Sequence, residues 1–186
     1  MAHISDLRAG IFTYLDMYTA ASGLAAADTD AEFKALFVGS TPGTATSADG
    51  AVAGVDTQLS FPSVREFPSI GTPANIVNVP VYGQKTTSQV QGQSDAPSLE
   101  VTVNYNATDM ADLHALVGTQ IAFRFMMAAA ACTLDERVNT AFATANTSFF
   151  FKGKIEAILV NASLTDATTA TITLSAQTDF IGPSTK

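Results

Sequence analysis

The chain has 186 residues, enough for one domain with a sizeable hydrophobic core or for two small ones at most. Hydrophobic residues make up 47% of it and charged residues only 14%, against about 25% charged in an average protein, so charge repulsion protects its surface weakly from self-association. The net charge of −8 argues against a surface that grips nucleic-acid phosphates, because such a grip needs clustered Lys and Arg.

Little side-chain chemistry is available. Two histidines and the single Cys132 cannot supply a zinc site or an intramolecular disulfide, and no nucleophile elbow is present. The acidic stretch Asp28–Glu32 fails as a calcium loop, since Phe33 and Gly39 stand where Gly and Glu are needed. We therefore expect no enzymatic activity, no cofactor and no metal. No signal-peptide pattern and no apolar run of about 20 residues is seen, so we expect a cytoplasmic product without a membrane span.

The first third of the chain gives the weakest pattern. Residues 5–23 suit either a short helix capped by Ser5 or an irregular arm that contains one strand. Residues 28–40 predict a short helix, with Thr29 or Asp30 as its cap. Residues 41–54 are rich in Gly, Thr and Ala and predict a loop. We expect residues 1–70 to form an N-terminal arm with an irregular and helical segment, packed on a core formed by residues 71–186.

From residue 75 onward the pattern predicts strands. Residues 75–83 favour a strand whose Pro80 belongs at an edge or bulge. Residues 84–98 lack any period and predict a long structureless loop, which is uncommon inside a domain and is usually functional or disordered. Residues 99–106 alternate strictly and predict a half-buried strand. Its predicted inner residues are Leu99, Val101, Val103 and Tyr105, and its predicted outer residues are Glu100, Thr102, Asn104 and Asn106.

A short amphipathic helix is predicted at about residues 109–117, before three further strands. Its apolar stripe is Met110, Leu113, Leu116 and Val117, with Gly118 as the terminating residue. A strand over residues 119–128 follows, with Ile121, Phe123 and Phe125 on one face. Two strands at residues 148–164 and 170–180 then form a hairpin. In the first of these, Phe149, Phe151, Ile155 and Leu159 should share a face, and Gly153 indicates a bend or close backbone approach. The fold class is therefore mainly β, an antiparallel β-sandwich or open barrel with one short helix.

The order of these elements resembles the major tail tube proteins of long-tailed, non-contractile (siphovirus-type) bacteriophages. The resemblance rests on "LEVTVNYNATDMADLHALVGTQIAFRFMM" and "FFFKGKIEAILVNASLTDATTATITLSAQTDFIG": an alternating strand, a "D-x-x-x-L-x-x-L" helix, a further strand and a closing hairpin. The matching positions are 109–116, 121–125, 149–164 and 170–183, within about the last 110 residues. The resemblance implies a structural virion protein of the tail, assembled in the host cytoplasm. Such subunits form hexameric rings that close into one β-barrel and stack into the conduit for genomic DNA during ejection.

The resemblance implies further copies of the same chain as partners, together with the tape measure, tail tip and terminator proteins. Four strands from each of six subunits, spaced about 4.8 Å apart, give a ring about 37–50 Å across, depending on tilt. Side chains about 5 Å deep leave a bore of ~27–40 Å for a duplex about 20 Å wide. An acidic, polar bore lets double-stranded DNA pass without tight binding. The candidate lumen-facing residues are Glu100, Thr102 and Asn104, and we expect Lys152 and Lys154 to lie outside the bore or to pair with acids such as Glu156.

The loop at residues 84–98 is then an arm that becomes ordered against a neighbouring subunit or the next ring, although a disordered surface loop remains an alternative. The candidate arm residues are Gln84, Lys85, Thr86, Thr87, Ser88, Gln89, Val90, Gln91, Gln93, Ser94 and Asp95. An alternative function is a β-sandwich carbohydrate- or receptor-binding module, disfavoured by the absence of Trp and by only four Tyr. A hydrolase on a β scaffold is a third, disfavoured by the missing motifs.

Overall fold

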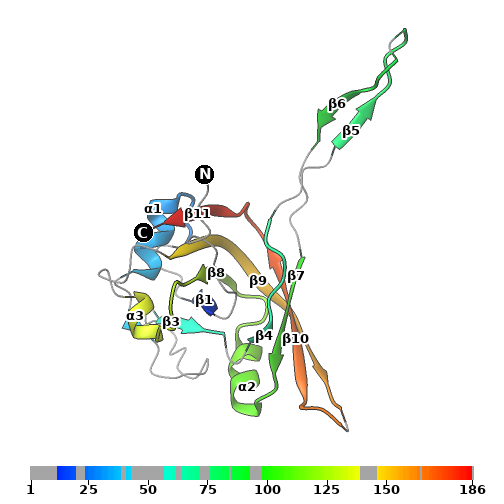
Figure 1. Cartoon of the computed structure of the whole chain (residues 1–186). Coiled ribbons are helices and arrows are strands. Elements are labelled where there is room, and N and C mark those ends of the chain that lie inside the picture. The colour runs from blue at the N-terminus through cyan, green and yellow to red at the C-terminus, as the bar shows by residue number, and fades with distance from the viewer. Residues whose placement is uncertain are drawn as a thin grey trace.

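A nine-stranded sheet organises the chain in a computed structural model that describes residues 12–19, 24–38, 41–42, 57–61, 64–71, 76–83, 85–92, 98–138, 146–163 and 165–185. The strand order is β2-β3-β1-β8-β9-β10-β7-β4, and β11 also pairs with β9 (Figure 1). The strands of this sheet are β1 (Thr13–Tyr18), β2 (Thr41–Pro42), β3 (Thr57–Ser60), β4 (Val64–Glu66), β7 (Ser98–Asn104), β8 (Gln120–Met127), β9 (Thr147–Asn161), β10 (Thr169–Ala176) and β11 (Ile181–Thr185). All pairings are antiparallel except that of β2 with β3. The predicted class, mainly antiparallel β, is confirmed, and the described strands form an open sheet.

The long strand β9 joins two halves of this sheet. Residues 147–154 of β9 pair with β8, whereas residues 153–161 pair with β10. The main hydrophobic core takes side chains from both halves and from the helix α2 (Ala107–Ala115). Within it, the Phe123 ring stacks on Phe151 at 5.0 Å between centroids and lies 6.3 Å from Phe61 of the segment after β3. The inner faces of the two halves are therefore buried against each other, as in a sandwich.

A second layer covers the other face of β1, β8 and β9. The helix α1 (Asp30–Phe37) buries Phe33 and Phe37 completely, and both rings stack on Phe150 of β9. Thr29, one of the two caps that the sequence predicted, caps this helix in a capping box with Glu32. Hydrogen bonds from the Thr29 hydroxyl and from the backbone N–H groups of Asp28 and Thr29 lower the pKa of Glu32. Because α1 covers this half of the sheet, β8 is buried on both faces.

The helix predicted at residues 109–117 begins and ends two residues earlier, as α2. Met110, Leu113 and Leu116 are buried in the main core, as expected. Val117 is not: the residue is 38% exposed, because the chain has left the helix there to form a bridge with Ile155 of β9. Gly118 has a positive φ of 79°, but it lies three residues beyond the end of α2.

The strand β7 follows its predicted alternation, with Leu99, Val101 and Val103 buried. Tyr105 was wrongly placed in the core; it lies beyond the last residue of the strand and is 41% exposed. The hairpin of β9 and β10 is confirmed, but Leu159 was also wrongly placed, being 59% exposed.

A β-bulge explains the error at Leu159. Thr173 of β10 pairs with Ala157, whereas the next residue, Leu174, pairs with Ile155, so Glu156 is an extra residue on β9. One extra residue reverses the alternation beyond it. Ile158 therefore packs against the core in place of Leu159.

The N-terminal third contributes more to the sheet than we expected. The strands β1, β3 and β4 precede residue 70, yet all three pair within the main sheet, and β1 lies between β3 and β8. The possible helix capped by Ser5 and most of the predicted loop at residues 41–54 lie outside the described residues. A five-residue helix, α3 (Leu134–Val138), follows β8.

Residues 84–98 were wrongly predicted to be structureless throughout. Ser88–Gln91 forms the strand β6, which pairs with β5 (Ile76–Val79) in a separate two-stranded sheet. The sequence did predict a strand at β5, and Pro80 lies just outside its pairing. This β5–β6 hairpin projects away from the main sheet (Figure 1).

Candidate assembly surfaces

The β5–β6 hairpin exposes apolar side chains that nothing in the described chain covers. Every residue of both strands is exposed. Its exposed large apolar residues are Ile76, Val77, Val79, Val81, Tyr82 and Val90, with Tyr82 fully accessible. An isolated two-stranded hairpin is at best marginally stable in water, and a contiguous apolar patch of this kind marks an interaction site.

The hairpin has one face dominated by valines and one that is mainly polar. Val77 lies directly opposite Val90, and Val79 is on the same face because strand side chains alternate. We call these three residues the valine face. The opposite face carries Asn78 and Gln89, which also pair directly, together with Ile76 and Gln91 at its base. This is the pattern of a half-buried sheet, although no described residue covers its apolar side.

Charge is nearly absent from this hairpin. In residues 76–83 and 85–92 the only charged residue is Lys85, near the tip. Low charge allows a segment to be buried in an interface without the cost of desolvating ions. Of the predicted arm residues, Lys85 to Gln91 lie on this hairpin, whereas Gln84, Gln93, Ser94 and Asp95 lie outside the described residues.

A second surface is the outer face of β7, β10 and the end of β9. The predicted lumen-facing residues Glu100 and Asn104 are exposed and Thr102 is half-buried. Each is paired with a threonine of β10: Glu100 with Thr173, Thr102 with Thr171, and Asn104 with Thr169. The structure therefore brings the three candidates onto one face, the polar face, and adds a row of hydroxyl groups that the sequence reading had not assigned.

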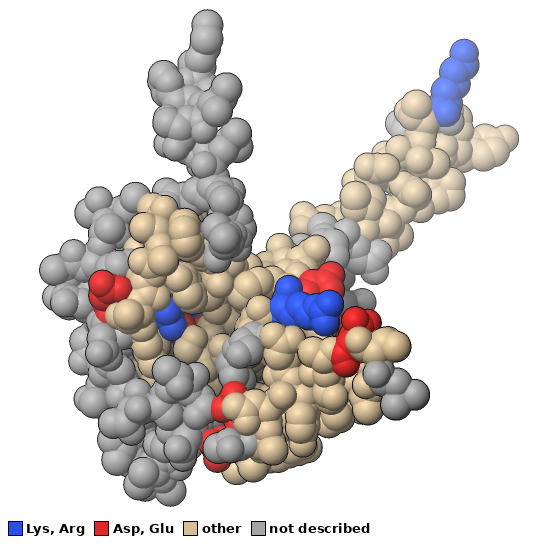
Figure 2. Space-filling model, turned by 60° about the horizontal axis from the view of Figure 1, so that its bottom comes forward, with Lys and Arg blue, Asp and Glu red and all other residues tan. Residues whose placement is uncertain are grey.

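Hydrogen bonds on this polar face run between neighbouring strands. The Asn161 side chain donates to Thr171 Oγ1 at 3.0 Å, and Ser175 Oγ donates to Glu156 Oε1 at 2.6 Å. Glu156, the bulge residue, is thus held by β10 and not by a lysine. Lys152 instead pairs with Asp28 at 2.7 Å and is buried on the side of α1. Figure 2 shows how few charged residues interrupt the described surface in that view.

Both borders of this part of the sheet are open. No described strand pairs with residues 157–161 of β9 on the side away from β10. At the other border, the three-residue strand β4 pairs only with β7 among the described strands. Open edges present unpaired N–H and C=O groups, to which another chain can add a strand.

A buried ionic cluster was missed by the sequence analysis. Asp16 of β1 is fully buried and accepts hydrogen bonds from Arg124 of β8 and from Arg137 of α3, at 2.6 and 2.9 Å for the shortest contacts. The Arg124 guanidinium lies 4.9 Å from the centre of the Phe37 ring, and that of Arg137 lies 4.3 Å from Tyr14. The sequence did contain a signal for this cluster, because a single charged residue lies within each of the apolar stretches "YLDMY" and "AFRFMM".

Among the described residues, no group of three or more His, Cys, Asp or Glu side chains is placed to hold a metal ion. No described helix has the length and apolar character needed to cross a membrane.

Comparison with known proteins gives likenesses among solved structures alone. No protein-family model matches the chain, and no curated protein matches it. Among solved structures, it is similar to the SPP1 tail tube, determined by combined solid-state NMR and cryo-electron microscopy. The identity is 18% and the TM-score 0.44, over 74% of this chain and 73% of that chain.

Proposed function

We propose that this chain is a structural virion protein that assembles with its own copies into the tube of a phage tail. The proposal rests mainly on the β5–β6 hairpin. Its valine face is apolar but exposed, and no described residue covers it. A second copy of the chain is the partner that the element order favours, because that order resembles the tail tube family. The hairpin would then become ordered against a neighbouring subunit or the next ring.

The open borders of the sheet support closure into a ring. The segment β9–β10–β7–β4 has four strands and an unpaired edge at each end. Four strands from each of six copies satisfy the ring geometry above, with a bore of ~27–40 Å. Closure would pair the edge of β9 in one copy with that of β4 in the next and would leave no exposed sheet edge.

The polar face suits the bore of such a ring. It presents hydroxyl and amide groups together with the acids Glu100 and Glu156, so it offers double-stranded DNA no array of cations to displace counterions. DNA would therefore slide along it without tight binding. Other tail proteins (tape measure, tail tip and terminator) would meet the tube at its ends.

Removal of the hairpin tests the proposal. Replacing residues 76–91 with a short Gly/Ser linker should leave a folded chain, because none of the described hairpin residues is buried. At concentrations where the complete chain forms rings or tubes in negative-stain electron microscopy, this variant should stay dispersed. Normal tubes from the variant would refute the role of the hairpin, and a complete chain that stays monomeric at every concentration would refute the proposal.

A matched pair of substitutions separates the two faces of the hairpin. Val77→Asp with Val90→Asp places two negative charges on the valine face and should abolish assembly, because buried unpaired charges are costly. Asn78→Asp with Gln89→Glu adds the same charge to the opposite face and should impair assembly far less. Equal effects of the two pairs would show that net charge, and not the valine face, controls assembly.

A further inference from the structure

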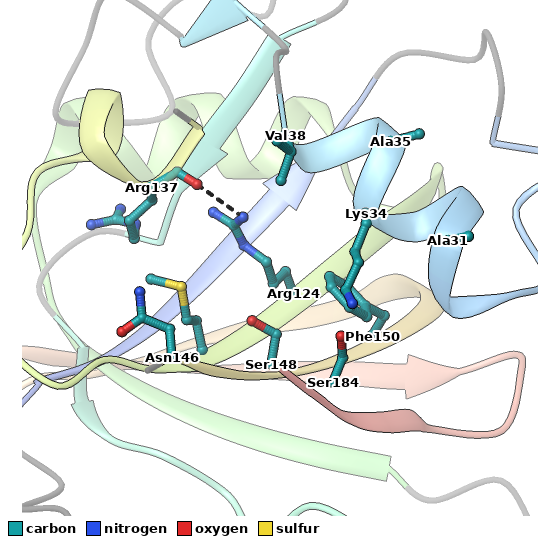
Figure 3. A pocket seen from close by; sticks show the side chains of 11 residues that line it. Ala31, Lys34, Ala35, Val38, Arg124, Arg137, Asn146, Ser148, Phe150 and Ser184 are labelled. Atoms are coloured by element: carbon teal, nitrogen blue, oxygen red, sulfur yellow. Dashed lines mark hydrogen bonds between the residues drawn. The ribbon is translucent and has the colours of Figure 1, made fainter. Parts of the chain in front are cut away.

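A cavity of about 310 Å³ lies between α1 and the strands β8, β9 and β11. Figure 3 shows Ala31, Ala35 and Val38 on the α1 side of it, and Ser148 and Phe150 on β9. The cavity shares no described lining residue with the polar face or with the β5–β6 hairpin. Its size is at the lower end of the range found for small-molecule sites, about 300–1,000 Å³.

Strand pairing and the helical repeat explain why these residues meet. Met126 pairs with Ser148, and Ser148 pairs with Ser184, so these three residues form one row across β8, β9 and β11. Ala31 and Ala35 are four residues apart in α1 and therefore lie on one face of the helix. Their short side chains leave a gap between this face of α1 and the row on the sheet.

The charged side chains of the described lining are already paired with acids. Lys34 pairs with Asp30 at 2.9 Å, and both Arg124 and Arg137 pair with Asp16. An anionic ligand would have to compete with these carboxylates, whereas a cationic ligand would lie beside three cations. A neutral ligand avoids both costs, because it brings no charge that must be desolvated and paired.

One hydroxyl group of the lining is buried without a partner. Ser184 is 5% exposed, and its Oγ has no hydrogen-bond partner among the described residues. Buried hydroxyl groups are normally hydrogen-bonded, and a hydroxyl group can both donate and accept. Figure 3 shows the side chains of Ser148 and Ser184 pointing into the cavity. The remaining wall is mainly apolar, from Val38, Met126 and Phe150, so the cavity suits a ligand with one polar group and an apolar body.

We propose that this cavity binds a small neutral aromatic molecule that carries one hydroxyl group, a phenol. The hydroxyl group would hydrogen-bond to Ser184, and the ring would lie between the alanines of α1 and Met126. A flat ring fits a gap that has small side chains on one side, and the thioether of Met126 makes favourable contacts with aromatic rings. A pure hydrocarbon would leave Ser184 without a partner. The inference does not depend on the proposed role in a tail tube.

Titration of the dispersed chain with p-cresol, followed by NMR, tests this site. We expect saturable shifts in the amide signals of Ala35, Val38 and Phe150, with a dissociation constant on the order of millimolar. p-Toluate, in which a carboxylate replaces the hydroxyl group, should bind more weakly, because the cations of the lining are already paired. No saturable shift with p-cresol, or equal or tighter binding of p-toluate, would overturn the proposal.

The variant Ser184→Ala tests the hydrogen bond to the ligand. It removes a buried hydroxyl group that has no partner, so the chain should still fold. It should weaken p-cresol binding about 2- to 10-fold and should not weaken the binding of toluene, which lacks the hydroxyl group. Ser88→Ala, on the exposed strand β6, is the matched control and should change neither affinity. Equal effects of Ser184→Ala on p-cresol and toluene would refute the assigned hydrogen bond.

A tyrosine of another copy carries the same phenol group, and Tyr82 on the β5–β6 hairpin is fully accessible. If this side chain were the occupant, concentrating the chain without p-cresol would shift the same amide signals, and Tyr82→Ala would remove those shifts. That result would assign the cavity to a neighbouring subunit and would overturn the proposal of a small-molecule ligand. We expect no such shifts at concentrations where the chain stays dispersed.

Discussion

The substitution Asp16→Asn is expected to destabilise the fold strongly. The Asp16 carboxylate is fully buried and accepts four hydrogen bonds of 2.6–3.2 Å from the guanidinium groups of Arg124 and Arg137. Asparagine has nearly the same shape but keeps only one acceptor oxygen. Its amide NH₂ group, a donor, would face guanidinium N–H groups that are donors as well. Two buried guanidinium groups would also lose the carboxylate that joins them.

The expected loss follows from the burial of all three side chains. Removing one partner of a buried ion pair costs about 3–5 kcal/mol, from a total stability of about 5–15 kcal/mol for a typical domain. For a chain of this length, that loss lowers Tm by about 6–20 °C. Replacing the whole cluster with Leu and Met (Asp16→Leu, Arg124→Met, Arg137→Met) should recover much of the loss, because no uncompensated charge remains.

Urea unfolding of the dispersed chain measures this effect. Far-UV circular dichroism and Tyr fluorescence are suitable probes, because the chain has four Tyr and no Trp. Asp166→Asn, on the exposed β9–β10 turn, is the matched control and should change the free energy of unfolding by no more than about 0.5 kcal/mol. A loss below about 1 kcal/mol for Asp16→Asn would refute the view that its carboxylate holds the two arginines in place.

Three further predictions concern the sheet and α1. Gly153→Ala should destabilise the chain by about 1–3 kcal/mol in urea unfolding, because a Cβ there would lie 2.5 Å from the Ser175 carbonyl oxygen; unchanged stability would contradict this close approach. Deleting Glu156 should remove the bulge without changing the register, so that Ile158 stays opposite Ile172 in the core and Leu159 stays exposed; methyl groups of Leu159 that become protected in NMR would contradict this account of the bulge. Because the pKa of Glu32 is lowered below its ordinary 4.5, the stability from its capping box is present at neutral pH and is lost as pH falls below about 4.5. A pH titration of amide exchange at the start of α1 should show this loss in the native chain and not in Glu32→Gln, which does not titrate.

Sequence reasoning placed residues correctly in elements where one periodic pattern runs without interruption and one face of the element is buried. The strand β7 alternates without interruption, and its three inner residues are buried as predicted. The same reasoning failed for β9. The extra residue Glu156 reverses which side chains face the core beyond it, and no local sequence signal marks a bulge there. Val117 was misplaced because the helical spacing continues through a residue that pairs with Ile155 in another strand.

The assembly surfaces were predicted in part. Residues 84–98 were recognised as unusual, but the pairing of Val90 with Val77 depends on a partner strand across a turn and cannot be read from that stretch alone. The candidate residues Glu100, Thr102 and Asn104 lie on one face because alternation within a single strand is local. The threonines of β10 beside them, like the meeting of Asp16 with Arg124, depend on pairing between strands distant in sequence.

The central claim is that copies of this chain complete one another's sheets and bury the β5–β6 hairpin. An electron-microscopy map of material assembled from the purified chain tests it most directly. We expect stacked six-membered rings whose bore is lined by Glu100 and the threonines of β10, with the valine face buried against another copy. A polymer that leaves the hairpin in solvent, or that turns the polar face outward, would contradict the account.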